Sequence, residues 1–356
     1  MDLTTLGWNA ETAAALAALC QPDWRPARVV SEDKHSVTLV GDDGDRMGII
    51  PGRLLHRSRS HADLPKVGDW VAASHVPGER KSVIEAVLPR RTKLARKVTG
   101  RESEEQVVAA NVDVVFVVQA MDNTFNARRL ERFLVMVHEG GSRPVVLLNK
   151  ADLCADPDRL VEQAQKAAGS GTVLVLSAKT RRGLGQLRAL LQPAHTVCFV
   201  GSSGVGKSSL INRLYGETIL DTLEVREGDS KGRHTTTWRE LIPLPGGALV
   251  IDTPGMREFH LWRVDEGLLG TFPDIAELAD GCHFHNCTHA HETDCAVKGA
   301  VAEGLLDRKR YESFLKLQRE QAAVRTEENR HQQRVEQRRA RQSRLRHGLE
   351  EDWGEE

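Results

Sequence analysis

Long apolar runs, cysteines and aromatic side chains are all scarce in this chain of 356 residues. No stretch approaches the roughly 20 consecutive apolar residues that a membrane-spanning helix needs, so the sequence predicts no membrane partner. The N-terminus has no Lys or Arg ahead of an apolar run, a pattern that is not typical of a secretory signal, and we expect a soluble, cytoplasmic protein. Six cysteines are too few for a disulfide scaffold of this length.

An excess of charge of either sign is missing as well, because 49 Lys and Arg residues are balanced by 50 Asp and Glu residues. A net charge near zero usually argues against a nucleic-acid partner. The charges are segregated, however, into cationic runs at residues 90–97 and 308–346, and the local field matters more than the total. The second run lacks Pro and Gly and is compatible with a helix that contacts RNA phosphates. For both runs a solvated surface is the open alternative.

Residues 27–98 contain five short β-type runs broken by Gly, Asp and Pro. The runs are residues 27–30, 36–40, 47–50, 69–74 and 82–88. Their number and length predict a small barrel of the OB type, whose exposed face often binds oligonucleotides. The aromatic residues here are chiefly Trp24 and Trp70, a shortage that argues against base stacking. A short Ala/Leu-rich helix at residues 11–19 precedes the barrel, and we expect it to pack against its neighbour.

From residue 107 onward, apolar runs alternate with helical segments. The expected strands are residues 112–120, 144–148, 173–176 and 197–200, and the expected helices are 128–138, 160–168 and 184–191. This alternation predicts a parallel sheet with helices on both faces. The chain is therefore expected to be a multidomain α/β protein. Its predicted parts are an extension (1–26), the barrel (27–98), the sheet domain (99–268) and a Cys/His-rich domain with a basic helix (269–356).

The segment Gly-Ser-Ser-Gly-Val-Gly-Lys-Ser at residues 201–208 satisfies the phosphate-loop pattern, and it lies between an expected strand and an expected helix. The glycines let backbone amides turn inward around a β-phosphate, and Lys207 can reach the β- and γ-phosphates. Ser208 can hold Mg²⁺ at the helix N-terminus. Lys207 is therefore a candidate catalytic residue too. The candidate nucleotide-binding residues of this loop are Gly201, Ser202, Ser203, Gly204, Val205, Gly206, Lys207, Ser208 and Ser209.

A second phosphate-side motif, Asp252-Thr253-Pro254-Gly255, follows an apolar strand. Its distance from the phosphate loop is typical of a Walker-B carboxylate, so Asp252 is expected to bind Mg²⁺ through water. The Gly255 amide can approach the γ-phosphate and make the following segment a nucleotide-sensitive switch.

Guanine recognition is indicated by Asn149-Lys150-Ala151-Asp152, which directly follows an expected strand. The Asp152 carboxylate can accept from both N1–H and the exocyclic amine of guanine, whereas adenine offers no such donor pair. An unsatisfied buried carboxylate is costly, so discrimination against ATP should be large. Ser177-Ala178-Lys179 supplies a second base loop, whose backbone amide can meet the guanine O6. A phosphate-loop kinase or ATPase remains a third-ranked alternative.

Both base loops precede the phosphate loop, which reverses the order of an ordinary GTPase. Such an order arises when the old ends of a domain are joined and a surface connection is cut. Together with Ala110–Asp113, Gly232–Thr237 and the cysteine-rich segment, it resembles the RsgA or YjeQ family of circularly permuted GTPases. The resemblance covers the chain from about Ala27. It implies GTP hydrolysis stimulated by the 30S subunit, a role in late maturation of that subunit, and contact with its 16S rRNA; we expect a monomer.

The hydrolytic machinery shows one departure, because Met256 stands where many GTPases keep a Gln that orients the attacking water. A thioether cannot place that water, so slow intrinsic turnover is expected unless a partner completes the site. The resemblance implies that His234 takes this role, although an exposed switch residue is equally open. Thr236 is the expected second Mg²⁺ ligand among three adjacent threonines. The alternative function is a GTP-switched rRNA-binding module with little turnover.

Three cysteines and several histidines crowd into one short segment with the spacing C-x4-C-x-H-x5-C. Three thiolates and one imidazole make a closed tetrahedral zinc site, so the metal is expected to be structural. Further histidines at positions 283, 285 and 291 leave the ligand choice open, and the family pattern selects the one at 289. The predicted ligands are Cys282, Cys287, His289 and Cys295.

Overall fold

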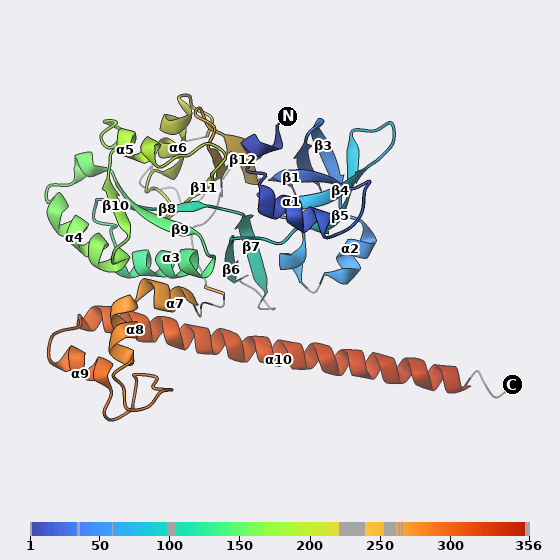
Figure 1. The fold of residues 1–356 in the computed structure, drawn as a ribbon. Helices are drawn as coiled ribbons and strands as arrows, with labels where there is room; N and C mark the ends of the chain where they lie inside the picture. The colour runs from blue at the N-terminus through green and yellow to red at the C-terminus, as the bar shows by residue number, and fades with distance from the viewer. Residues whose placement is uncertain are drawn as a thin grey trace, which may run out of the picture.

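The computed structural model describes residues 2–33, 36–58, 60–97, 104–220, 239–252, 261–262, 264 and 266–352. Figure 1 shows a small barrel beside a helix-covered sheet, with one long helix running beneath both. This architecture confirms the predicted multidomain α/β fold class. Within the described part of the chain, no helix combines the length and the apolar character needed to cross a bilayer.

The barrel consists of five strands that close on themselves. They are β1 (Arg25–Glu32), β2 (Val37–Gly41), β3 (Gly44–Ile49), β4 (Trp70–His75) and β5 (Lys81–Val87). The hydrogen-bonded order is β1-β2-β3-β5-β4, and β4 pairs back with β1. Val29, Leu39 and Ile84 fill the interior. All five predicted strands are present, and their closed order confirms the OB-type barrel. The connection from β3 to β4 carries α2 (Gly52–Arg57) and the 3₁₀ turn η2 (His61–Asp63).

The N-terminal segment packs against the barrel, as expected. It forms the 3₁₀ turn η1 (Leu3–Leu6) and the helix α1 (Ala10–Ala17), which Asn9 caps through the Thr12 amide. The Trp8 ring meets the Trp70 ring edge-on, with 4.8 Å between centroids. Aromatic pairs favour this geometry, so the segment extends the hydrophobic core of the barrel.

A two-stranded hairpin of β6 (Lys93–Lys97) and β7 (Glu105–Ala110) follows the barrel. It contains most of the first cationic run, and the structure gives each of its cations a partner within the protein. The pairs are Arg90 with Asp69, Arg91 with Asp113, Lys93 with Glu105, Arg96 with Gln106 and Lys97 with Glu327. The run is therefore engaged in internal contacts, which neither the RNA-contact nor the solvated-surface interpretation anticipated.

The large sheet has a parallel central part. In spatial order its strands are β10 (Thr172–Val175), β9 (Arg143–Asn149), β8 (Val114–Ala120), β11 (Thr196–Val200) and β13 (Leu249–Asp252), with antiparallel β12 (Arg239–Pro243) beside β13. β12 also pairs with β1 of the barrel, through Ser31 and Glu240. Barrel and sheet are therefore one hydrogen-bonded surface.

Helices cover both faces of this sheet, as predicted. The helices α3 (Ala127–Glu139) and α4 (Pro157–Ala168) lie on one face, and α5 (Leu184–Ala189) and α6 (Lys207–Tyr215) lie on the other. Strand β8 sends Val115 and Val117 into the first core and Phe116 and Val118 into the second. This two-sided burial explains why β8 is apolar at nearly every position rather than at every second one.

The C-terminal part is helical. It contains α7 (Glu266–Thr271), α8 (Pro273–Ala279), α9 (Ala296–Ala302) and α10 (Arg308–Asp352). In Figure 1 α10 runs beneath α3 and α7 and then past the β6–β7 hairpin. The ion pair between Lys97 and Glu327, at 2.5 Å, joins that hairpin to α10. The predicted domain boundaries stay predictions, and the one after residue 98 lies outside the described residues.

Candidate functional site

The predicted phosphate loop connects the end of β11 to the start of α6, in the expected strand–loop–helix context. Gly201 lies against the Val118 carbonyl and Gly206 lies against the Asn149 side chain, both with positive φ, and a Cβ at either position would collide. Lys207 Nζ donates to the carbonyl oxygens of Gly201 and Ser202, at 2.8 and 2.9 Å. The loop therefore has the tight backbone path that phosphate binding by amides requires.

Asn149, at the end of β9, joins all three predicted loops. Its Nδ2 donates to the Val205 carbonyl of the phosphate loop at 2.8 Å, although the two residues are 56 positions apart. Its Oδ1 accepts from the Ala178 amide of the second base loop at 3.0 Å. The Asn149 side chain is buried, so both hydrogen bonds are shielded from water. The sequence-distant motifs thus meet at one place.

Two of the predicted guanine-reading residues, Ala151 and Asp152, lie in the 3₁₀ turn η3 (Ala151–Leu153), which Lys150 precedes. The Ser177 hydroxyl donates to Asp152 Oδ1 at 2.5 Å, so the second base loop orients the predicted guanine acceptor. Lys150 has a left-handed backbone, with φ of 64°, and its ammonium lies 3.2 Å from Asp122. Burial tends to raise the pKa of Asp122, but hydrogen bonds from Thr124 and the Lys150 ammonium outweigh it and lower that pKa.

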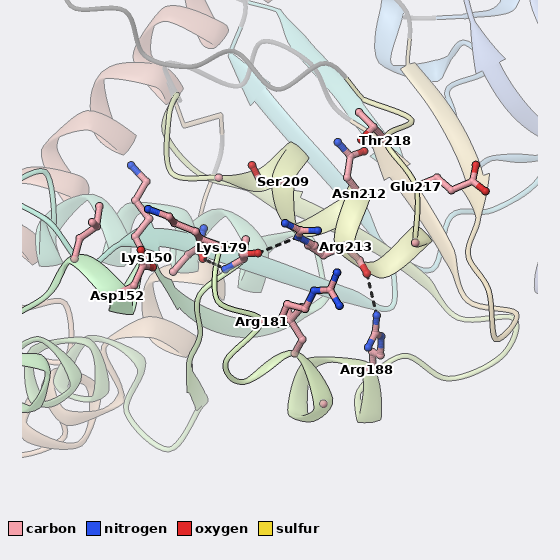
Figure 2. Close-up of a pocket in the computed structure, with 17 residues that line it drawn as sticks. Lys150, Asp152, Lys179, Arg181, Arg188, Ser209, Asn212, Arg213, Glu217 and Thr218 are labelled. Carbon is pink, nitrogen blue, oxygen red and sulfur yellow. Dashed lines mark hydrogen bonds between the residues drawn. The ribbon is translucent and has the colours of Figure 1, made fainter.

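A pocket of about 760 Å³ opens beside these loops, within the size range of small-molecule sites. Figure 2 shows Lys150 and Asp152 on one side of it and Asn212 with Thr218 on the other. Predicted residues in its lining are Asn149, Lys150, Asp152, Ala178, Lys179, Gly206 and Ser209. Ala151 and Ser177 are buried and are not part of the lining. The pocket is thus lined by both predicted base loops and by the start of α6.

Sequence analysis missed several polar residues of the same lining. They are Arg181, Arg188, Asn212, Arg213, Glu217 and Thr218. Asn212 Oδ1 accepts from the amides of Ile219 and Leu220, which orders the chain that leaves α6 along the pocket. Arg213 donates to the Ala178 carbonyl at 3.0 Å (Figure 2). In the sequence these are ordinary helix and turn residues, and no local spacing distinguishes them.

The predicted magnesium ligands Ser208 and Asp252 lie at one edge of the sheet. Ser208 is in the first turn of α6, and Asp252 ends β13. Strands β11 and β13 are parallel neighbours, with Cys198 beside Ile251, so their carboxyl ends point the same way. A hydroxyl and a carboxylate at this edge suit the oxygen-ligand preference of Mg²⁺. His234, Thr236 and Gly255 lie outside the described residues, in 221–238 and 253–260.

The four predicted metal ligands come together between α8 and α9. The ligand atoms of Cys282, Cys287, His289 and Cys295 all lie within 4.8 Å of one another. The sulfurs of Cys282 and Cys295 are 3.8 Å apart, and His289 Nδ1 is 3.6 and 3.5 Å from them. A tetrahedral ion with metal–sulfur bonds of about 2.3 Å requires sulfur separations of about 3.8 Å, so the cluster fits one tetrahedral ion.

Two contacts support the loop that carries this cluster. Glu292 accepts from the Thr288 hydroxyl and amide, at 2.6 and 2.8 Å, and these hydrogen bonds lower the pKa of Glu292 to about 2. The Tyr311 hydroxyl of α10 donates to the His289 carbonyl at 2.6 Å. The metal cluster and the start of α10 are therefore one structural unit.

Comparisons with known proteins agree with this geometry. The family described as RsgA GTPase matches residues 87–262. The small ribosomal subunit biogenesis GTPase RsgA of Opitutus terrae is 46% identical over 331 residues, covering 90% of each chain. The protein of the same name from Syntrophotalea carbinolica is 42% identical and covers 91% of each chain.

Two solved structures share the fold. The crystal structure of YjeQ from Thermotoga maritima superimposes with a TM-score of 0.61 at 29% identity, covering 84% of this chain and 99% of that one. The circularly permuted GTPase YloQ gives 0.59 at 26% identity, covering 84% and 96%. The permuted motif order inferred from the sequence is confirmed by this likeness.

Proposed function

This chain belongs to the RsgA GTPase family, and from that membership we propose that it hydrolyses GTP to GDP and phosphate during late maturation of the 30S ribosomal subunit. The observation that carries the proposal is the Asn149 side chain, which joins the guanine-reading loops to the phosphate loop beside one pocket. Relatives named for small ribosomal subunit biogenesis support the assignment of the partner.

In this proposal Asp152 accepts from guanine, and Lys150 with residues 177–179 completes the base site. Residues 201–209 enclose the phosphates, with Lys207 neutralising charge that develops on the transferred phosphoryl group. Ser208, Thr236 and Asp252 hold Mg²⁺, and the Gly255 amide contacts the γ-phosphate. His234 orients the attacking water, a role that Met256 cannot take.

We further propose that the Cys₃His cluster holds one structural zinc ion. Three thiolates and an imidazole form the donor set that zinc prefers, and their closed arrangement leaves no open position for a substrate. In this proposal the basic part of α10 contacts phosphates of the 16S rRNA. Binding to the 30S subunit should therefore weaken as the salt concentration rises. The protein acts in the cytoplasm as a monomer.

The test is the GTPase rate with and without purified 30S subunits. We expect slow turnover by the protein alone and acceleration of at least tenfold by 30S subunits, with 50S subunits as the matched control. ATP in place of GTP should give no turnover above buffer. Because Met256 favours slow chemistry, a GTP-switched binding module is the second candidate. It would replace the first if 30S subunits bound in a GTP-dependent manner but left the rate unchanged.

A further inference from the structure

A polar chain at the start of α3 connects the base-reading loop to the phosphate loop. Asp122 accepts from Lys150 with one carboxylate oxygen, and its other oxygen accepts from the Thr124 amide and hydroxyl, at 2.9 and 2.5 Å. The Thr124 carbonyl accepts from Arg129 Nη2 at 3.2 Å. Arg129 Nη1 donates to the Ser202 hydroxyl of the phosphate loop at 2.7 Å. The guanidinium is therefore fixed at one end and contacts the loop at the other.

The other arginines of α3 contact the C-terminal part of the protein and not the phosphate loop. Arg132 forms an ion pair of 2.7 Å with Glu320 of α10. Arg128 contacts Glu131 and lies 3.1 Å from Asp307, just before α10. The geometry thus separates two surfaces of one helix: Arg128 and Arg132 face the C-terminal part, and Arg129 faces the nucleotide site.

We propose that Arg129 is a positioning residue of the nucleotide site, which orders the phosphate loop through the Ser202 side chain. Lys207 contacts the Ser202 carbonyl, so Arg129 and Lys207 act on different atoms of the same residue. Because the Arg129 guanidinium is planar and also donates to the Thr124 carbonyl, its side chain loses little conformational entropy when it donates to the Ser202 hydroxyl. A loop already in its binding conformation binds phosphates more tightly, because less ordering remains to be done on binding. The inference rests on the proposed nucleotide assignment.

A double-mutant cycle tests the proposal. The variants are Arg129→Gln, Ser202→Ala and their combination, and the readout is the Kd for GDP and for GMP, which lacks the β-phosphate. We expect Arg129→Gln to weaken GDP binding about tenfold, as for loss of a charge-assisted hydrogen bond. GMP binding should change less than twofold. In the Ser202→Ala background, Arg129→Gln should add less than twofold, because its acceptor is already gone.

Two controls keep the result interpretable. Arg132→Gln removes an ion pair from the same helix and should leave GDP affinity within twofold of the parent. Arg129→Lys keeps the positive charge but cannot donate both hydrogen bonds in the same geometry. Its GDP affinity should therefore lie between those of the parent and Arg129→Gln. Fully additive effects in the cycle, or equal losses for GMP and GDP, would overturn the proposal. If the parent protein itself failed to bind GDP, the proposed function would fail instead.

Discussion

Asn149 shows how one side chain can determine the geometry of a whole site. A buried amide that uses both its donor and its acceptor fixes the relative position of the two groups it contacts, here Ala178 and Val205 in two different loops. Gly206 has no Cβ where the Asn149 amide approaches, so the two residues depend on each other. Replacing either one would separate base recognition from phosphate binding.

At Asp152 we predict a change of nucleotide preference. Asp152→Asn replaces one acceptor with a donor, so guanine loses its matched partner while the O2 of xanthine gains one. GDP affinity should fall at least a hundredfold, and xanthosine diphosphate should bind more tightly than GDP. Competition against a fluorescent nucleotide measures both constants. Unchanged GDP affinity would remove Asp152 from the base site. The matched control is Asp158→Asn, the same substitution at an exposed position outside the pocket lining.

The motif residues of the site could be found from sequence because their chemistry fixes their spacing. A phosphate loop needs glycines at set positions, and base recognition needs a carboxylate just after a strand. Arg129 and Asn212 could not be found this way, because their roles arise from tertiary contacts with Ser202 and with the chain at Leu220. Such contacts leave no local pattern, since an arginine or asparagine on a helix is usually just solvated.

At the scale of elements, α3 carries a buried acid that anchors α10. Glu131 is 1% exposed and accepts from Arg310 and from the Ser313 hydroxyl. Arg310 also donates twice to Asp274, at 2.6 and 2.8 Å, and lies over the Phe272 ring. Because Glu131 and Arg310 are both shielded from water, these two residues depend on each other.

We predict that Arg310→Met lowers the free energy of unfolding by about 1.5–3 kcal/mol, because buried Glu131 keeps Arg128 but loses one of its two cationic partners. Urea unfolding followed by circular dichroism measures the loss. Glu131→Gln in the Arg310→Met background should restore part of it, since the buried charge is removed. Arg308→Met, at an exposed position two residues away, should cost less than 0.5 kcal/mol. Equal effects at the two arginines would contradict the buried network.

The packing of α3 against α7 should also depend on pH. His138 lies against Gly270, and burial lowers the pKa of His138, so the folded protein favours the neutral ring. Above a pH of about 6.5, the pKa of histidine in the unfolded chain, the His138 ring is neutral in both states and burying it carries no protonation penalty. As the pH falls below that value toward the lowered pKa of the folded state, the unfolded chain takes up the proton first, and the folded protein becomes less stable. His138→Gln should therefore show a smaller drop in Tm between pH 7.5 and 5. An identical drop in both proteins would exclude this group.

Elements with a clear sequence pattern were predicted, whereas the β6–β7 hairpin was not. Strand β8 and helix α3 have patterns that local sequence reveals. The β6–β7 hairpin was missed because Lys93, Arg96 and Lys97 obscure its strand character. Their partners come from the opposite strand or, for Lys97, from Glu327 of α10. The charge of a segment therefore does not predict what the segment contacts until its neighbours in the folded structure are known.

At the scale of the molecule, the metal cluster should stabilise the C-terminal part without shaping the nucleotide pocket. We expect one zinc ion per chain by elemental analysis. Chelation of the metal, or Cys287→Ser, should lower the Tm and reduce the helical circular dichroism signal. Without the metal, the loop at His289 is no longer held in place, and α10 loses the hydrogen bond from Tyr311 to the His289 carbonyl. GDP affinity should stay within twofold. Cys154→Ser, outside the cluster, is the matched control, and a metal-free protein of unchanged Tm would contradict the structural role.

The joint between barrel and sheet should depend on Arg28, which is 1% exposed and contacts three separate segments. It donates to the Leu6 carbonyl of the N-terminal segment, the Gly68 carbonyl of the barrel and the Thr196 hydroxyl of β11. Burial lowers the pKa of Arg28 to about 10, so it remains charged at neutral pH.

Arg28→Met fills a similar volume but leaves these acceptors without a donor, and each unsatisfied buried acceptor costs about 1–3 kcal/mol. We therefore expect the free energy of unfolding to fall by at least about 3 kcal/mol, and limited proteolysis to cut first near the N-terminal segment. Arg25→Met, at an exposed ion pair with Asp42, should change stability by less than 0.5 kcal/mol. GDP affinity of the folded Arg28→Met protein should match the parent, because Arg28 lies outside the nucleotide pocket. A stable variant with an uncut N-terminal segment would show that apolar contacts such as Trp8 on Trp70 suffice to hold the joint.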